Sequence, residues 1–311
     1  MAVVEVAVQD HIALVTLNRP DARNSLSPEV LVRLWAAWQQ IEDDDDVRVA
    51  IITGAGEKAF CAGADLGLLI PLTTGARQPE NEFDEIVVAD RGLGGRAMLR
   101  DWTPSKPVIA AVNGHAIAGG CEIVQGTDIR VAADTARFGV QEVKWALYPI
   151  GGSSVRLPRQ FPEAIAMELL LTGDLLDAAT CHRYGFVNHV VPAADVIAKA
   201  MEIAGKIAAN GPLAVKAIKA GAREARGLPE AEAPRRVASL DRKIAVEAVA
   251  NEDLRSGGAF VLVDRAGGGA DQRVIRRGKA GIDGVDRLFR DARIVLAEPG
   301  SDIPISRCRT A

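Results

Sequence analysis

Two apolar segments of the chain are each followed by a glycine-rich sequence. VRVAIITG, residues 47–54, leads into GAGEKAFCAGADL, residues 54–66, and KPVIAAVNG, residues 106–114, leads into HAIAGGCEIV, residues 115–124. A continuous apolar run bounded by glycine is typical of a strand buried on both faces. A third such run, DIRVAA, covers residues 128–133, and helical periodicity dominates the later part of the chain. The pattern therefore predicts an α/β protein.

The N-terminal part predicts a hairpin and then a helix. AVVEVAV and HIALVTL read as two strands joined by Gln9-Asp10. Ser27 and Pro28 are typical of a helix N-cap and first helical position, and Val30, Leu34, Trp38 and Ile41 repeat at helical spacing. Acidic residues are unfavourable at a helix C-terminus, so the run Glu42 to Asp46 predicts its end.

The C-terminal part predicts further helices and an irregular tail. Helical patterns follow Pro162, with a break at residues 210–212, and a last helix is predicted through Val237, Leu240, Ile244 and Ala248. From Arg265 onward the sequence begins with a run of three glycines and has no sustained periodicity. We expect this tail to be flexible and dispensable for catalysis.

Composition narrows the function classes. The 311 residues carry a formal net charge of −4, which argues against nucleic-acid binding because phosphates must be neutralised by Lys and Arg. No apolar run is long enough to span a membrane and the N-terminus lacks a signal-peptide pattern. The four cysteines have no metal-ligand spacing, which favours a reduced, cytoplasmic protein without a metal site; they are Cys61, Cys121, Cys181 and Cys308.

Both glycine-rich segments could present backbone N–H groups to a ligand. Small residues let a ligand approach the backbone, and the N–H groups of a helix N-terminus stabilise an anion. Two such segments acting together could form an oxyanion hole. From spacing alone, close packing of the backbone is the more common reason for either segment. Neither has the pattern of a dinucleotide-binding loop.

Taken together, these segments resemble the signature blocks of the enoyl-CoA hydratase/isomerase, or crotonase, family. The resemblance is carried by ITGAGEKAFCAGADL, residues 52–66, and by KPVIAAVNGHAIAGGCEIVQGTDIRVAADTARFGVQEVKWALYPIGG, residues 106–152. LLLTGDLLDAATCHRYGFVNHVVP and IAANGPLAVKAIK are similar to the blocks that follow. Order and spacing agree over roughly residues 3 to 260.

The resemblance implies a crotonase-like fold, which is a spiral of ββα repeats followed by a helical trimerisation region. On this basis we expect a spiral core over residues 1–195, a helical region over 196–260 and a divergent tail over 261–311. A homotrimer or a dimer of trimers is expected. The family binds acyl-CoA thioesters, so no cofactor is expected beyond the coenzyme A of the substrate.

The resemblance also assigns residues to roles. The backbone N–H groups of Ala64 and Gly119 are expected to stabilise a thioester enolate. Glu122 is expected to activate water as a base and Glu142 to act as the acid. Without the family, Glu122 reads as a helix-end charge and Glu142 as an exposed acid.

Further residues are expected to contact the substrate. Arg23 occupies a position where the family often places a cation near the CoA phosphates, although an exposed loop arginine explains it equally well. The segment expected to hold the CoA adenine and pantetheine comprises Ala62, Gly63, Ala64, Asp65 and Leu66. Ile150 stands where the family usually has a glycine, beside the acyl pocket, and the segment from Gly67 to Ser105 is longer than the common form.

The function implied is enoyl-CoA hydration, the reversible syn addition of water to a 2-enoyl-CoA. Alternatives within the family are isomerisation, decarboxylation and thioester hydrolysis, for which a single acid would be typical. The alternative from another class is a non-catalytic acyl-CoA- or RNA-binding member, which would lack one glutamate or carry a basic core.

Overall fold

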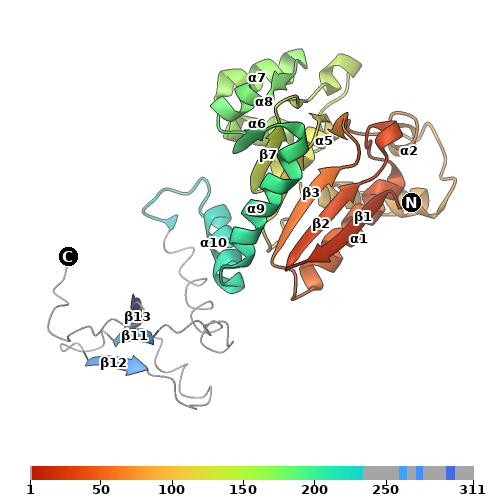
Figure 1. The fold of residues 1–311 in the computed structure, drawn as a ribbon. Coiled ribbons are helices and arrows are strands. Elements are labelled where there is room, and N and C mark those ends of the chain that lie inside the picture. Colours follow the sequence, from red (N-terminus) through yellow and green to blue (C-terminus); the bar gives the residue numbers. More distant parts are fainter. Residues whose placement is uncertain (1, 234–258, 265–270, 276–291, 298–311) are drawn as a thin grey trace. The chain divides into compact units, whose positions relative to one another are not determined.

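The computed structural model describes residues 2–233, 259–264, 271–275 and 292–297 and is shown in Figure 1. The chain forms two compact units, Met1–Asn210 and Gly211–Ala311.

A six-stranded sheet forms the centre of the first unit. Its strand order is β1-β2-β3-β5-β7-β10, and only the β1–β2 pair is antiparallel. The three apolar runs predicted as strands are confirmed as β3, β5 and β7. The strands are β1 (Val4–Gln9), β2 (Ile12–Leu17), β3 (Val49–Gly54), β5 (Val108–Val112), β7 (Ile129–Ala133) and β10 (His189–Val191).

The predicted N-terminal hairpin is confirmed, with its turn one residue later than expected. Gln9 pairs with Ile12, so Asp10 and His11 form the turn. Both have positive φ, at 50° and 66°, as a tight hairpin turn requires.

A second sheet, of order β4-β6-β8-β9, collects the short strands. They are β4 (Ala59–Cys61), β6 (His115–Ile117), β8 (Arg137–Gly139) and β9 (Leu176–Asp177). Strands β3, β5 and β7 of the first sheet each lead into β4, β6 and β8 of the second, and a helical segment follows. This repetition is the predicted ββα spiral, and it brings the glycine-rich segments after β4 and β6 side by side because β4 pairs with β6.

Helix α1 (Pro28–Asp43) begins and ends as predicted. The Ser27 side chain accepts a hydrogen bond from the Val30 N–H at 3.3 Å, which satisfies one free donor of the first turn. The buried face includes Leu34 and Trp38. The Trp38 indole N–H donates to the Ala97 carbonyl at 2.9 Å. This bond joins α1 to the long chain segment that connects β4 to β5.

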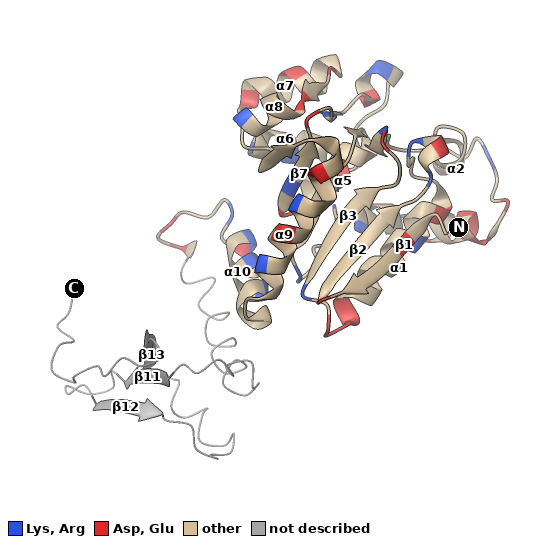
Figure 2. Ribbon diagram, in the orientation of Figure 1, with Lys and Arg blue, Asp and Glu red and all other residues tan. Residues whose placement is uncertain are grey.

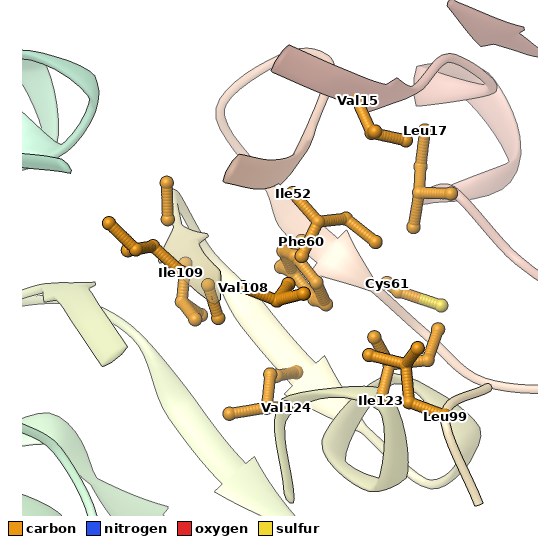
Figure 3. Close-up of a cluster of buried hydrophobic side chains, with 14 of the residues drawn as sticks. Val15, Leu17, Ile52, Phe60, Cys61, Leu99, Val108, Ile109, Ile123 and Val124 are labelled. Carbon is orange, nitrogen blue, oxygen red and sulfur yellow. The ribbon is translucent and has the colours of Figure 1, made fainter. Parts of the chain in front are cut away.

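The remaining helices of the first unit surround these sheets. Helix α9 (Val196–Ala208) packs against β3, β5 and β7. Figure 3 shows part of the buried core, which includes Val15, Ile52, Phe60, Ile123 and Val124. The others are η1 (Pro20–Ala22), α2 (Leu69–Thr73), α3 (Glu82–Ala89), α4 (Leu93–Ala97), α5 (Gly119–Gly126), η2 (Glu142–Trp145), α6 (Ser153–Gln160), α7 (Glu163–Thr172), α8 (Ala178–Arg183) and η3 (Ala193–Asp195).

The second unit contains helix α10 (Pro212–Glu224) and a three-stranded antiparallel sheet of order β12-β11-β13. Its strands are β11 (Ala259–Asp264), β12 (Asp271–Ile275) and β13 (Ala292–Ala297). No strand was predicted in this tail. The helix predicted through Val237, Leu240, Ile244 and Ala248 lies outside the described residues.

The charge and hydropathy of the described helices can be followed in the structure. Figure 2 shows residues of both signs on α9 and α10. Within the described residues, no helix is long and apolar enough to cross a membrane.

Candidate active site

The two glycine-rich turns contact each other through Gly63 and the start of α5. Gly63 has φ of +93°, and a Cβ added to it would lie 2.7 Å from the Ala118 Cβ and 3.2 Å from the Gly119 nitrogen. Only glycine suits this position, because the backbone conformation and the close approach both exclude a side chain. The structure thus joins two segments that the sequence separates by about fifty residues.

Backbone hydrogen bonds of the residues on either side of Ala64 fix its position, and its own N–H takes no part in them. The Leu26 N–H donates to the Gly63 carbonyl at 2.8 Å, and the Asp65 N–H donates to the Leu26 carbonyl at 3.0 Å. Within the described residues, no acceptor of the chain takes the Ala64 N–H. This donor is therefore available to a ligand.

Gly119 opens helix α5, and its N–H has no acceptor in the part of the chain that the structure describes. The first intrahelical bond runs from the Glu122 N–H to the Ala118 carbonyl at 3.0 Å, so the N–H groups before Glu122 have no acceptor inside the helix. Ala118 has φ of 50° and ψ of −125°, a conformation that L-residues rarely adopt. Its N–H donates to the Gly139 carbonyl at 2.9 Å, which holds the turn in place.

Gly119 and Gly120 differ in the space around them. A Cβ on Gly119 would meet only the ends of flexible side chains at its shortest contact, 3.0 Å from the Leu26 Cδ1. A Cβ on Gly120 would collide with the Cys61 carbonyl oxygen and lie 2.8 Å from its carbonyl carbon. Gly120 is therefore required for the packing of α5 on β4, whereas Gly119 is not confined in this way.

Glu122 is almost completely buried, at 2% exposed, and several donors hold its carboxylate. Its Oε1 accepts from the Ser153 N–H at 3.2 Å and from the Ser153 hydroxyl at 3.0 Å, and the Gly151 N–H is a further donor. Burial raises the pKa of Glu122, and these bonds and the charge of Arg100 oppose that rise.

Glu142 lies at the start of η2 and has the opposite environment. Its Oε2 is buried and has no hydrogen-bond partner among the described residues. Burial, and then the negative charge of Glu122, raise the pKa of Glu142 to about 7. The electrostatic interaction places both carboxylates in one neighbourhood, although twenty positions separate them in the sequence.

The difference in hydrogen-bond donors determines which of the two carboxylates ionises more readily. Two carboxylates close together in a partly buried site do not both ionise readily near neutral pH. Donors to a carboxylate favour its charged form, and Glu122 has three while Glu142 has none for Oε2. The hydrogen bonds therefore favour the charged form of Glu122 over that of Glu142.

The residues expected to hold coenzyme A lie in the loop after β4 and, for Arg23, directly after η1. Arg23 is exposed, and its carbonyl accepts the Ala62 N–H at 3.0 Å, so it fixes the loop through its backbone while its side chain faces solvent. The Leu66 side chain is 55% exposed. Both side chains are thus accessible to a ligand.

Asp65 is engaged within the protein instead. Its Oδ2 accepts from the Arg19 guanidinium at 3.0 Å and the Ser25 hydroxyl at 3.1 Å, and its Oδ1 accepts from the N–H groups of Gly67 and Leu68. Burial alone would raise the pKa of Asp65, but these bonds outweigh burial and lower it. The Asp65 carboxylate therefore anchors the loop that carries Ala64.

Ile150 is 68% exposed, and its carbonyl accepts a hydrogen bond from Arg100. It belongs to an exposed apolar series that follows Glu142 along the chain. The series comprises Val143, Trp145, Leu147, Tyr148 and Ile150. Exposed apolar side chains therefore follow Glu142 directly along the chain.

Sequence reasoning missed the residues that hold Glu122. Gln125 lies one turn after Glu122 on α5, a spacing that could have suggested a shared face. Ser153 and Gly151 left no signal beyond the GGSS sequence at residues 151–154. Their role depends on the turn from η2 into α6, which local sequence does not specify.

The three described cysteines, Cys61, Cys121 and Cys181, are free and buried. Burial raises the pKa of Cys61 and of Cys121 to about 12, so neither thiol ionises near neutral pH. Cys308 lies outside the described residues. Among described residues, no group of three or more His, Cys, Asp or Glu side chains could hold a metal ion.

Comparison with known proteins gives a consistent result. Residues 7–260 match the enoyl-CoA hydratase/isomerase family. The enoyl-CoA hydratase EchA19 of Mycobacterium tuberculosis is 44% identical over 247 residues, which cover 79% of this chain and 88% of that protein. The (E)-benzylidenesuccinyl-CoA hydratase of Thauera aromatica is 40% identical over 226 residues, covering 73% and 84% of the two chains.

Solved structures agree with these relatives. The crystal structure of the enoyl-CoA hydratase EchA1 from Mycobacterium marinum superposes with a TM-score of 0.69 at 40% identity, covering 82% of this chain and 93% of that one. The match spans both glycine-rich turns and both glutamates. This chain belongs to the enoyl-CoA hydratase/isomerase family.

Proposed function

We propose that this protein is an enoyl-CoA hydratase that adds water reversibly to a 2-enoyl-CoA thioester. The observation that carries the proposal is the unequal carboxylate pair: Glu122 accepts three hydrogen bonds, and Glu142 has a buried oxygen with no partner among the described residues. Hydration needs one group that removes a proton from water and one that delivers a proton to carbon. An ionised Glu122 and a protonated Glu142 supply both.

The proposed mechanism uses each group once. The N–H groups of Ala64 and Gly119 stabilise the negative charge that develops on the thioester oxygen. Glu122 takes a proton from water as its oxygen bonds to the β-carbon, and Glu142 gives its proton to the α-carbon. Because both carboxylates face one water from one side of the double bond, the addition is syn. Charge balances, since one carboxylate gains the proton that the other loses.

Recognition of the substrate is assigned to the loop after β4. The Arg23 guanidinium is proposed to contact the CoA phosphates, and the adenine and pantetheine to lie along Ala62, Gly63, Ala64, Asp65 and Leu66. The exposed Ile150 is proposed to border the acyl group. No cofactor is proposed beyond the coenzyme A of the substrate.

A panel of 2-enoyl-CoA esters tests the proposal. Loss of the conjugated-thioester absorbance is expected for at least one ester, and reaction in D₂O is expected to place deuterium and hydroxyl on the same face. Absence of turnover on every ester would refute hydration. Migration of the double bond without uptake of water would instead identify an isomerase.

Assembly as a homotrimer or a dimer of trimers, in the cytoplasm, completes the proposal. The resemblance to the family supports the trimer, and the absence of metal-ligand spacing among the cysteines supports a reduced, cytoplasmic setting. Light scattering coupled to size-exclusion chromatography checks it. A monomer at micromolar concentration would contradict it.

A further inference from the structure

Ser153 and Gln125 form a hydrogen-bonded chain that ends on Glu122. The Gln125 Nε2 lies 2.9 Å from the Ser153 Oγ, and that oxygen lies 3.0 Å from the Glu122 Oε1. Ser153 is 0% exposed and Gln125 is 3% exposed. Water therefore does not compete for these bonds, and each group depends on the others for its partner.

The direction of the chain follows from counting protons. An ionised carboxylate only accepts hydrogen bonds, so the Ser153 hydroxyl must give its single proton to Glu122. Its oxygen then serves as an acceptor, and the amide group facing it must be the donating Nε2 of Gln125. An ionised Glu122 thus fixes the orientation of both side chains.

Two helices supply this arrangement. Glu122 and Gln125 lie one turn apart on α5, and Ser153 is the first residue of α6. Its backbone N–H has no acceptor inside α6 and donates to the same Glu122 oxygen at 3.2 Å. One residue therefore delivers two donors to a single carboxylate oxygen.

From this geometry we infer that Ser153 is a positioning residue that holds Glu122 in the orientation needed to activate water, and that Gln125 in turn orients Ser153. Neither side chain contacts the reacting atoms. The inference rests on the proposed hydratase function, and its test includes a measurement that needs no substrate.

The groups around Glu122 define what that measurement reports. Glu142 on η2 repels its charge, Arg100 attracts it, and Cys121 on α5 is a buried thiol beside it. None of these groups is altered when only the Ser153 hydroxyl is removed. A change in the titration of Glu122 is then attributable to the lost hydrogen bond.

The first experiment is an infrared titration of the protein without substrate. The carboxylic-acid band of Glu122 is identified by its loss in Glu122→Gln. In Ser153→Ala, its midpoint should rise by roughly one pH unit, because removing a donor disfavours the charged form. Ser154→Ala is the matched control, since Ser154 lies one residue along α6 and bonds to the exposed Tyr148 hydroxyl instead. An unchanged midpoint in Ser153→Ala would overturn the inference.

The second experiment is kinetic. Ser153→Ala should lower kcat roughly 10- to 100-fold with little change in KM, as expected for losing a hydrogen bond to a charged group, and should move the acidic limb of the pH–rate profile upward. Ser153→Cys keeps the volume but donates weakly, so an intermediate rate is expected. The fall in kcat should be smaller for Gln125→Met than for Ser153→Ala.

The outcomes separate the two proposals. A wild-type protein with no turnover would refute hydration, while the infrared shift would still establish the positioning of Glu122. A wild-type hydratase whose Ser153→Ala variant keeps its rate and pH profile would refute the positioning role. A lower rate with an unchanged profile and infrared midpoint would also refute it, because that result indicates general loss of packing.

Discussion

The surroundings of Glu122 and those of Glu142 differ in almost every physical respect. Glu122 lies in the first turn of a fully buried helix and accepts three hydrogen bonds. Glu142 opens a short 3-10 segment without a buried residue, followed by exposed apolar side chains. The Glu122 carboxylate is held by hydrogen bonds in a buried helix, and Glu142 precedes a run of exposed apolar side chains.

The difference shows how one fold gives two identical side chains unequal surroundings. Burial disfavours charge on both, and the donors that oppose it are more numerous at Glu122, which has two from Ser153 and one from Gly151, than at Glu142, where only its own backbone N–H lowers the pKa. The hydrogen bonds therefore favour the charged form of Glu122 more strongly. In the proposed mechanism, the choice of acid and base follows from these hydrogen bonds rather than from the residue type.

Removing either carboxylate should have the largest effect. Glu122→Gln and Glu142→Gln are each expected to lower turnover by about 10²–10⁴, the range for loss of a positioned acid or base. The fold loss of turnover in the double variant should be far smaller than the product of the two single-variant losses, because the two groups act on one water. Near-normal activity in either single variant would reject the pair, and Glu168→Gln, on the exposed face of α7, is the control.

Gly119→Val should cost at least about 10²–10³ in rate, the value of one oxyanion donor. The added bulk obstructs the oxygen or displaces the turn, while the fold should persist because flexible side chains surround this position. Gly120→Ala is the comparison: its Cβ would collide with the Cys61 backbone, so its melting temperature should fall more. If Gly119→Val stays active, or merely unfolds, the oxyanion role fails.

Gly151→Ala tests whether the fixed position of Glu122 matters. A Cβ there would collide with the Glu122 carboxylate and lie 2.9 Å from its Oε1, so the carboxylate must move. A displacement of this size is expected to lower kcat by up to about 10², with a smaller change in KM. Full activity would show that Glu122 tolerates movement.

Gly205→Ala should have the smallest effect, and it should stabilise the protein rather than impair it. Gly205 lies inside α9, and nothing lies within 4 Å of the added Cβ. Alanine reduces the entropy of the unfolded chain and favours the helix, so the free energy of unfolding should rise by about 0.4–1 kcal/mol. Thermal unfolding measures it, and a lower melting temperature would indicate that this face of α9 is covered by another surface.

Much of the first unit could be predicted because its signals are local. Ser27 and Pro28 specify the start of α1, and glycine-bounded apolar runs specify β3 and β5. Strands β12 and β13 were missed because their short runs lack periodicity. Their pairing with β11 depends on partners distant along the chain.

The site was assigned by family resemblance rather than by local signals. The resemblance pointed to both glutamates and both glycine-rich turns, and their roles stay predictions. It gave no account of Ser153, Gln125 or Gly151, because they meet Glu122 only after η2 and α6 have folded back onto α5. The different surroundings of the two carboxylates therefore arise from tertiary contacts.

The dependence of kcat/KM for hydration on pH tests the central claim most directly, since it reports the ionisation of the free enzyme. A bell-shaped profile is expected, because the pair titrates in two steps. Rate should fall at low pH as Glu122 becomes protonated, and fall again above about 7 as Glu142 loses its proton. The alkaline limb should disappear in Glu142→Gln. A rate that stays constant well above pH 7, or an alkaline limb that survives in Glu142→Gln, would contradict the assignment of Glu142 as the acid.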